Sequence, residues 1–239
     1  MSQTTPFNTA RLMQIEIPID HSVKLEITTI VSKMFSQNAF ILRRTDRHDC
    51  LIVDPSFEYQ RMSEYLLDHR YDVAAILNTH GHIDHIFGNE QMKRQFPAAP
   101  LIIGELEAYK LTDAEANLSA SYGIEIKSPN ADKTVKHGEI VSYAGISLET
   151  RLTPGHSIGH VVWICQATEV AVVVNGDVLF AGSVGRTDFP DGDFEALEQS
   201  IQKQLYTLPN DTIVLTGHGN ITTIGQEKDT NPFVRPVGG

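Results

Sequence analysis

One short segment of the chain has a high density of side chains that bind metal ions: Thr79-His80-Gly81-His82-Ile83-Asp84-His85. Imidazole nitrogens and carboxylate oxygens are common protein ligands of zinc, iron and manganese. His80 and His82 alternate, so an extended backbone would point both rings to the same side. Asp84 and His85 follow and can face a second point nearby. The alternative is a solvated loop that happens to be rich in histidine, but this spacing favours a loop that supplies ligands to two cations.

Three more potential ligands follow strand-like apolar runs, each next to a glycine. They are His156, Asp177 and His218. Any one of them alone would be an ordinary turn residue. Together with the first segment they predict one centre of five histidines and two aspartates, which is enough to hold two divalent metal ions. The donor atoms are nitrogen and oxygen only, so zinc is our first choice, and iron and manganese also fit.

The predicted chemistry is hydrolysis. Two divalent cations about 3.5–4 Å apart share a water molecule and lower its pKa, so that a metal-bound hydroxide exists near neutral pH and acts as the nucleophile. A cation also polarises the scissile carbonyl and stabilises the oxyanion that forms. No nucleophilic side chain is needed. We expect Asp84 to orient the metal-bound hydroxide.

Alternating strands and helices must position these residues. Apolar runs rich in β-branched residues predict strands at 24–31, 39–42, 51–53, 73–77, 101–103, 140–143, 146–152, 161–165, 170–174 and 213–216. Helical spacing predicts helices at 58–69, 86–96, 105–120 and 193–205. The candidate ligands come just after four of these strands. Two halves that each contribute strands and helices indicate a layered α/β sandwich.

The ligand pattern as a whole resembles the complete ligand set of the metallo-β-lactamase superfamily: His80-x-His82-x-Asp84-His85, then His156, Asp177 and His218. The resemblance implies an α/β fold, the four-layer αββα sandwich, with the site at one edge between the sheets. We expect one such domain over residues 1–239, with residues 1–22 as an N-terminal extension or the first strand.

The resemblance also implies how the ligands divide between the two metal ions. His80, His82 and His156 would hold the first metal. Asp84, His85 and His218 would hold the second, and Asp177 would bridge both.

Further similarity points to one branch of the superfamily. Asp177 stands where the commonest metallo-β-lactamases carry a cysteine, and a bridging carboxylate is the pattern of glyoxalase II. The strings at 185–190, 217–219 and 222–225 are similar to single-domain, glyoxalase II-like (hydroxyacylglutathione hydrolase-like) bacterial hydrolases. This implies thioester hydrolysis, with S-lactoylglutathione or a similar hydroxyacyl thioester as the small-molecule substrate. Full-length glyoxalase II continues into a helical, glutathione-binding domain, for which residues 220–239 are too few, so the thiol half of the substrate stays open.

Other activities of the same fold remain alternatives. Persulfide dioxygenase resembles this chain at the metal motif and holds a single iron, here by His80, His156 and Asp177. The string at 217–225 favours the hydrolase. Lactonase and phosphodiesterase activities are further alternatives. A binding protein without enzymatic activity would be expected to lack some of the ligands, and here the ligand set is intact.

Three residues near the predicted centre have open roles. Asp54 ends a predicted strand and either supports a histidine of the first loop through its ring N–H or caps a turn before Pro55. Arg186 either binds a substrate carboxylate or forms a salt bridge with Asp188 or Asp191. His160, four residues after His156, is expected to pack against the wall of the site rather than to bind metal.

The bulk properties exclude several other classes of protein. A net charge of −11 at pH 7 argues against a nucleic-acid partner. No apolar run approaches the ~20 residues that span a bilayer, and the N-terminus lacks a signal-peptide pattern, so we expect no membrane association and a cytoplasmic location. Cys50 and Cys165 lie in apolar runs and are expected to be reduced, buried thiols. The oligomeric state is left open.

Overall fold

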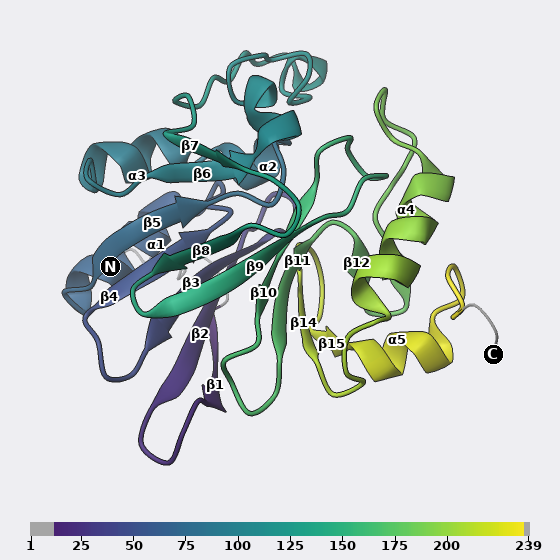
Figure 1. The fold of residues 1–239 in the computed structure, drawn as a ribbon. Coiled ribbons are helices and arrows are strands. Elements are labelled where there is room, and N and C mark those ends of the chain that lie inside the picture. The colour runs from purple at the N-terminus through teal and green to yellow at the C-terminus, as the bar shows by residue number, and fades with distance from the viewer. Residues whose placement is uncertain (1–11, 237–239) are drawn as a thin grey trace, which may run out of the picture.

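Two β-sheets lie face to face in the computed structural model, which describes residues 12–236 (Figure 1). The first sheet has seven strands, in the order β1 (Leu12–Pro18), β2 (Lys24–Val31), β3 (Asn38–Arg44), β4 (Asp49–Val53), β5 (Asp72–Leu77), β6 (Leu101–Gly104) and β7 (Lys133–Val135). The second has six strands, in the order β15 (Thr222–Thr223), β14 (Ile213–Thr216), β11 (Val172–Gly176), β10 (Val161–Cys165), β9 (Ile146–Leu152) and β8 (Ile140–Tyr143). Strands β12 (Leu179–Phe180) and β13 (Ser183–Val184) form a separate two-stranded sheet.

Helices cover the outer face of each sheet (Figure 1). Helices α1 (Tyr59–Asp68) and α3 (Asn89–Gln95) bury Met62, Leu66 and Met92 against the first sheet. Helices α4 (Phe194–Ser200) and α5 (Ile224–Thr230) bury Leu197 and Ile224 against the second. The layers therefore follow the order helix, sheet, sheet, helix, and the predicted four-layer αββα sandwich is confirmed.

The central strand β4 shows why apolar runs rather than alternating patterns mark the strands of this fold. Leu51 and Val53 point into the core between the sheets, whereas Cys50 and Ile52 point into the core beneath the helices. Successive side chains of a strand face opposite sides, so a strand covered on both faces needs apolar residues at every position. The fully buried Trp163 of β10 packs into the core between the sheets.

The candidate ligands follow strands that end at one common edge. Strands β9, β11 and β14 run in the same direction, because β10 is antiparallel to both β9 and β11, and β11 is parallel to β14. The end of β5 in the first sheet meets this edge, where the N–H of Val161 donates to the carbonyl oxygen of Thr79 at 2.9 Å. The carboxyl ends of four strands from two sheets thus converge on one place.

Most predicted strands agree with the structure within one or two residues, but the segment 105–120 does not form the predicted α-helix. It contains the 3₁₀ segment η1 (Glu105–Leu111), irregular turns, and then η2 (Ala120–Tyr122). The Asp113 carboxylate accepts hydrogen bonds from the backbone N–H groups of Glu115 and Ala116. Such local capping competes with helical hydrogen bonds, which explains why the helix does not continue.

Other differences lie at short or terminal elements. The helix predicted at 86–96 is divided into α2 (Ile83–Ile86) and α3, and the one at 193–205 ends in a π-helical turn, Ile201–Leu205. Within the predicted N-terminal extension or first strand at 1–22, the structure places β1, paired antiparallel to β2; residues 1–11 lie outside the described part. No helix in the described part of the chain is long and apolar enough to cross a membrane.

Candidate metal centre

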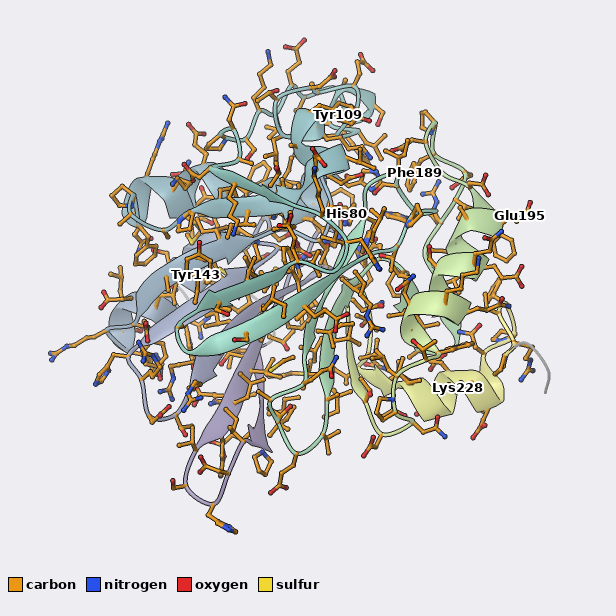
Figure 2. All side chains as sticks on the ribbon, viewed as in Figure 1. His80, Tyr109, Tyr143, Phe189, Glu195 and Lys228 are labelled. Carbon is orange, nitrogen blue, oxygen red and sulfur yellow. The ribbon has the colours of Figure 1, made fainter. Side chains whose placement is uncertain are left out.

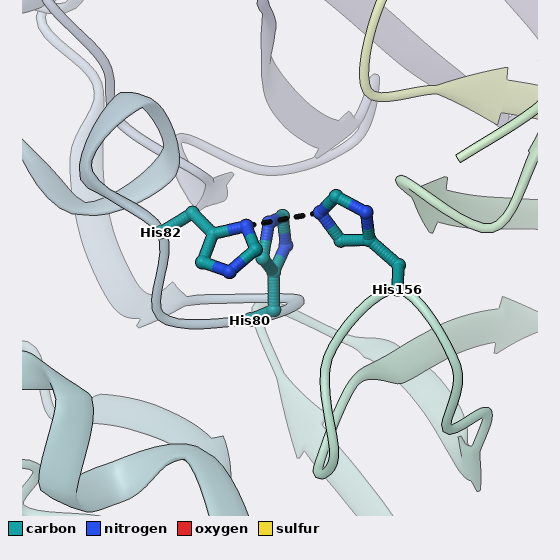
Figure 3. Close-up of side chains that lie close together, drawn as sticks. All are labelled: His80, His82 and His156. Atoms are coloured by element: carbon teal, nitrogen blue, oxygen red, sulfur yellow. Dashed lines mark hydrogen bonds between the residues drawn. The ribbon is translucent and has the colours of Figure 1, made fainter. Parts of the chain in front are cut away.

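Seven side chains from four loops meet at the common strand edge: His80, His82, Asp84, His85, His156, Asp177 and His218. Figure 3 shows three of them, with the rings of His82 and His156 turned toward each other and the ring of His80 between them in this view. Nδ1 of His82 and Nε2 of His156 are 2.9 Å apart. The structure therefore brings together every residue that the sequence predicts as a metal ligand.

These side chains form three overlapping groups whose candidate ligand atoms lie within 4.8 Å of one another. The groups are His80, His82 and His156; His80, His85 and Asp177; and Asp84, His85 and His218.

Asp177 lies between the outer groups. Its Oδ1 is 3.4 Å from Nε2 of His85, and its Oδ2 is 3.5 Å from Nε2 of His156 and 3.3 Å from Nε2 of His218. One carboxylate thus faces both halves of the cluster, as a bridging ligand must.

The surroundings of the histidines orient their rings toward the centre. Nδ1 of His156 donates to the carbonyl oxygen of Arg186 at 2.8 Å, and Nδ1 of His218 donates to that of Phe35 at 3.0 Å. Nδ1 of His85 donates to Asp54 Oδ2 at 3.0 Å. With Nδ1 fixed as the donor, Nε2 is the nitrogen of each ring that faces the centre, and it can bind a metal ion once it carries no proton.

The unsatisfied atoms of the site match the needs of metal ions. Within the described residues, Nε2 of His80, Nε2 of His85 and Oδ1 of Asp177 are buried without a hydrogen-bond partner. Buried polar atoms normally have partners, because desolvating them without compensation costs free energy. Imidazole nitrogens and carboxylate oxygens that converge in this way fit divalent cations.

The electrostatics divide the cluster into two halves. Burial and the neighbouring imidazoles lower the pKa of His80 and His82 well below the usual value, and burial lowers the pKa of His156. These three rings are neutral and can donate lone pairs at neutral pH.

The other half is a network of opposite charges. Burial opposes the charged form of His85, but the carboxylates of Asp177, Asp84 and Asp54 outweigh burial and raise the pKa of His85 well above its usual range. The pKa of His218 rises to about 10, because Asp177 and Asp84 outweigh the effect of burial.

Asp54 lies beside His85, as required by one of its two predicted roles, the support of a histidine in the first loop. Besides His85, its carboxylate accepts hydrogen bonds from the backbone N–H of Thr79 at 2.8 Å and from the Thr79 hydroxyl at 2.7 Å. That hydroxyl lies 3.1 Å from Nδ1 of His80. Asp54 therefore contacts one candidate ligand directly and reaches a second through Thr79.

His160 lies in the wall of the site, as expected, and within the described residues it belongs to none of the three groups. Its ring stacks on His80 with centroids 4.8 Å apart. Nε2 of His160 accepts a hydrogen bond from the backbone N–H of Asp177 at 3.1 Å, and Nδ1 lies 3.1 Å from the Thr153 hydroxyl. This ring helps to place the backbone of Asp177.

A cavity of about 240 Å³ opens onto the cluster, with a mostly apolar rim: Phe35, Ile83, Leu118, Tyr122, Phe180 and Phe189. Arg186 also lines it. The Arg186 guanidinium forms two 2.9 Å hydrogen bonds with Asp188 and lies 4.7 Å from the centre of the Phe189 ring. The predicted salt bridge with Asp188 is therefore present, and binding of substrate by Arg186 stays a prediction.

Two glycines at the centre allow the loops to approach each other. A Cβ atom on Gly217 would lie 2.1 Å from Oδ1 of Asp177. Gly176 has φ +50°, and a Cβ there would lie 2.6 Å from both the His160 ring and the Thr79 hydroxyl. A side chain at either position would displace the atoms that face the centre.

Comparison with known proteins identifies the family. The model of the metallo-beta-lactamase superfamily matches residues 33–218, a range that includes all seven candidate ligands. The chain belongs to the metallo-β-lactamase superfamily. It is a metallo-hydrolase of this superfamily, in agreement with the resemblance noted in the sequence.

Two curated relatives within the metallo-β-lactamase superfamily match nearly their whole length. Hydroxyacylglutathione hydrolase GloC of Haemophilus influenzae is 36% identical over 217 residues, which cover 88% of this chain and 98% of that protein. The probable metallo-hydrolase YqgX of Bacillus subtilis is 37% identical over 198 residues, which cover 82% of this chain and 92% of that protein.

Two solved structures of the metallo-β-lactamase fold are also similar. BLEG-1, described as a B3 metallo-beta-lactamase, superposes with a TM-score of 0.81 at 33% identity, over 93% of this chain and 99% of that one. TTHA1623, solved in a di-iron-bound form, superposes with a TM-score of 0.75 at 29% identity, over 86% of this chain and 99% of that one.

Proposed function

We propose that this protein is a two-metal thioester hydrolase that acts on S-lactoylglutathione or a similar hydroxyacyl thioester. The observation that carries the proposal is the position of Asp177, a buried carboxylate that faces both groups of candidate ligands. The similarity to a hydroxyacylglutathione hydrolase supports the substrate class.

In this proposal the two outer groups of the three overlapping ones form the two metal positions. His80, His82 and His156 would hold one metal ion, Asp84, His85 and His218 would hold the other, and Asp177, which lies between them, would be shared by both. Divalent cations bound by these residues would supply Lewis acidity and would lower the pKa of a bound water. Zinc is our first choice, and the di-iron form of TTHA1623 makes iron the first alternative to test.

The chain itself must bind the substrate and orient the attacking water. Asp84 lines the cavity, and its Oδ2 lies 3.2 Å from Nε2 of His218. Burial opposes ionisation of Asp84, but His85 and His218 outweigh it and lower its pKa, so the side chain is a carboxylate. A carboxylate accepts a hydrogen bond from the attacking water and so aims the water's lone pair at the acyl carbon.

The overall reaction adds water to the thioester carbonyl. An oxygen–carbon bond forms, the carbon–sulfur bond breaks, and the products are a hydroxy acid and a free thiol. The apolar rim of the cavity suits the alkyl portion next to the sulfur. Arg186 at the rim is proposed to pair with a substrate carboxylate in place of Asp188.

The test is release of free thiol from S-lactoylglutathione by protein loaded in turn with zinc, iron and manganese. Rapid release that disappears in Asp84→Ala, while that variant still folds, is the expected result. Absence of release with every metal would refute the substrate assignment. Hydrolysis of a β-lactam, which the description of BLEG-1 suggests as a second activity, and oxygen uptake with a persulfide are the next assays.

A further inference from the structure

A cluster of three charged residues, two of them buried, lies against the loops of the candidate metal centre. Glu107 and Lys110 of η1 are 0% and 1% exposed, and Asp191 comes from the loop before α4. Figure 2 marks this region by the neighbouring Tyr109 of η1. Charged side chains are rarely this buried unless they are paired and hydrogen-bonded. The burial of Glu107 and Lys110 therefore calls for an explanation.

The Glu107 carboxylate joins the two loops that supply the first ligand group. Oε2 accepts a hydrogen bond from the backbone N–H of Gly81 at 2.8 Å, and Oε1 accepts one from the backbone N–H of Gly159 at 2.8 Å. Gly81 lies between His80 and His82, and Gly159 lies three residues after His156. One side chain thus spans the gap between the loops.

Lys110 and Asp191 extend the connection to a third loop. Nζ of Lys110 is 2.6 Å from Asp191 Oδ2 and 3.3 Å from Glu107 Oε2. The same Asp191 oxygen accepts a hydrogen bond from the backbone N–H of Ile158 at 3.1 Å. The loop of Asp191 also contains Arg186, whose carbonyl oxygen accepts the N–H of His156.

The glycines at these contacts show that the loops need to approach η1 closely. A Cβ on Gly81 would lie 2.6 Å from Cβ of Lys110, and a Cβ on Gly159 would lie 2.6 Å from Cβ of Leu106. Neither contact leaves room for a side chain. The short distance is what lets both backbone N–H groups reach one carboxylate.

We propose that Glu107, supported by Lys110 and Asp191, is a positioning residue that sets the spacing of the loops carrying His80, His82 and His156. The proposal rests on the assignment of these histidines as ligands of one metal ion. It concerns metal affinity and loop order, and it does not depend on which substrate is hydrolysed. A merely structural role for the cluster would change stability without changing these two properties.

The decisive variant is the double substitution Glu107→Gln/Lys110→Met. Removing Lys110 alone would leave buried carboxylates without their cation, which threatens folding. The double variant removes one negative and one positive charge, so the net charge of the cluster is unchanged, and side-chain volume is nearly conserved. The N–H groups of Gly81 and Gly159 reach different oxygens of Glu107. In glutamine one of these two positions carries an NH₂ group, which donates and cannot accept, so one of the two hydrogen bonds is lost.

A control pair lies at the start of β6, the opposite end of that strand from η1. Oδ2 of Asp132 accepts a hydrogen bond from the backbone N–H of Leu101 at 2.8 Å and lies 2.8 Å from Nζ of Lys93. This pair has the same chemistry but contacts none of the ligand loops. Asp132→Asn/Lys93→Met therefore measures the effect of losing a similar but more exposed pair away from the ligand loops; the Lys93 and Asp132 side chains are 19% and 46% exposed.

The experiment measures metal affinity by competition with a chelator, the visible spectrum of the cobalt-loaded protein, and amide hydrogen exchange of Gly81 and Gly159 without metal. Partners that orient metal ligands typically contribute about 10–100-fold in affinity, and we expect a loss of that size for the first equivalent. We also expect a changed cobalt spectrum and faster exchange of at least one of the two glycine amides. The control should show none of these changes.

Wild-type affinity, spectrum and exchange in a folded double variant would overturn the proposal, and so would an equal loss in the control. Should the double variant fail to fold, Asp191→Asn, at a side chain that is 23% exposed, replaces it with the same readouts and the same criteria. Wild-type protein that binds no metal would instead refute the proposed metal centre, and the exchange of the two glycine amides would then decide the positioning role.

Discussion

Replacing Asp54 by asparagine should weaken one metal position and spare the other. Asp54 Oδ2 accepts the Nδ1 proton of His85 at 3.0 Å and the Thr79 hydroxyl proton at 2.7 Å, while Oδ1 accepts the N–H of Thr79 at 2.8 Å. Asparagine can keep the Thr79 N–H on its carbonyl oxygen, which puts its NH₂ group opposite His85. Nδ1 of His85 must then become an acceptor, and the proton moves to Nε2, the atom that faces Asp177.

The size of the effect follows from this change of tautomer. A protonated Nε2 has no lone pair for a metal ion, so the affinity of the position formed by Asp84, His85 and His218 should fall about 10–100-fold, or about 1.4–2.7 kcal/mol. The loss of a charged hydrogen bond should lower the free energy of unfolding by about 1.5–3 kcal/mol, which a folded domain can tolerate. Asparagine is a better choice than alanine, because Asp54 has φ 51°, a conformation that asparagine adopts more readily.

The assay is stepwise metal titration against a chromophoric chelator, with chemical unfolding measured in parallel. Asp132→Asn serves as a control, since Asp132 accepts a backbone N–H away from the site. Two separate affinities, of which only one changes in Asp54→Asn, would support the reasoning. Unchanged affinities in a folded variant would refute it, and equal loss at both steps would show that Asp54 acts on the whole loop.

Three further predictions concern the rim, the packing and the charges of the site. Arg186→Ala should raise KM for an acidic thioester more than it lowers kcat, whereas Asp188→Ala, which frees the guanidinium, should not raise KM; an unchanged KM in Arg186→Ala would rule out substrate pairing. Gly217→Ala should lower the free energy of unfolding by about 1–3 kcal/mol and weaken metal binding, because the new Cβ would lie 2.1 Å from Oδ1 of Asp177. Unfolding titrations and metal analysis measure these two effects, and wild-type values of both would contradict the prediction. Metal-free protein should lose stability as pH rises: the pKa of His218 is about 10 in the folded state against an ordinary value of 6.5, so its contribution is complete below 6.5 and is lost as pH rises through 10. Urea unfolding across this window should show a smaller decrease in His218→Ala, and an equal decrease in both proteins would remove His218 as the cause.

The sequence alone was sufficient for the ligands and the strands that carry them. The strand before His80 and the one before His218 are short apolar runs that end at polar, glycine-containing turns, and both features depend on neighbouring residues only. The spacing His80-x-His82 places two rings on one side of an extended chain, whatever surrounds it. For these reasons the candidate ligands and the strands that carry them could be predicted without coordinates, whereas the αββα order of the layers was predicted from the resemblance to a known family.

The roles of the supporting residues depended on contacts between distant parts of the chain. Glu107 lies 26 residues from Gly81 and 52 residues from Gly159, and Asp54 lies 31 residues from His85. In the sequence, Glu107 and Lys110 look like an ordinary exposed pair on a helix. No local pattern distinguishes such a pair from a buried one. The roles of Glu107 and Lys110 therefore could not be predicted from the sequence, and the role of Asp54 could not be decided from it.

The position of Asp177 between two ligand groups was likewise decided by tertiary structure. Gly176 ends β11 and Gly217 directly follows the adjacent parallel strand β14. Because Gly217 has no Cβ, the Asp177 carboxylate has room to lie close to both His85 and His218. The types of ligand are a property of the residues themselves, and they are therefore readable in the sequence. The distances between ligands result from how two sheets and their connecting loops pack together, which only the folded chain determines.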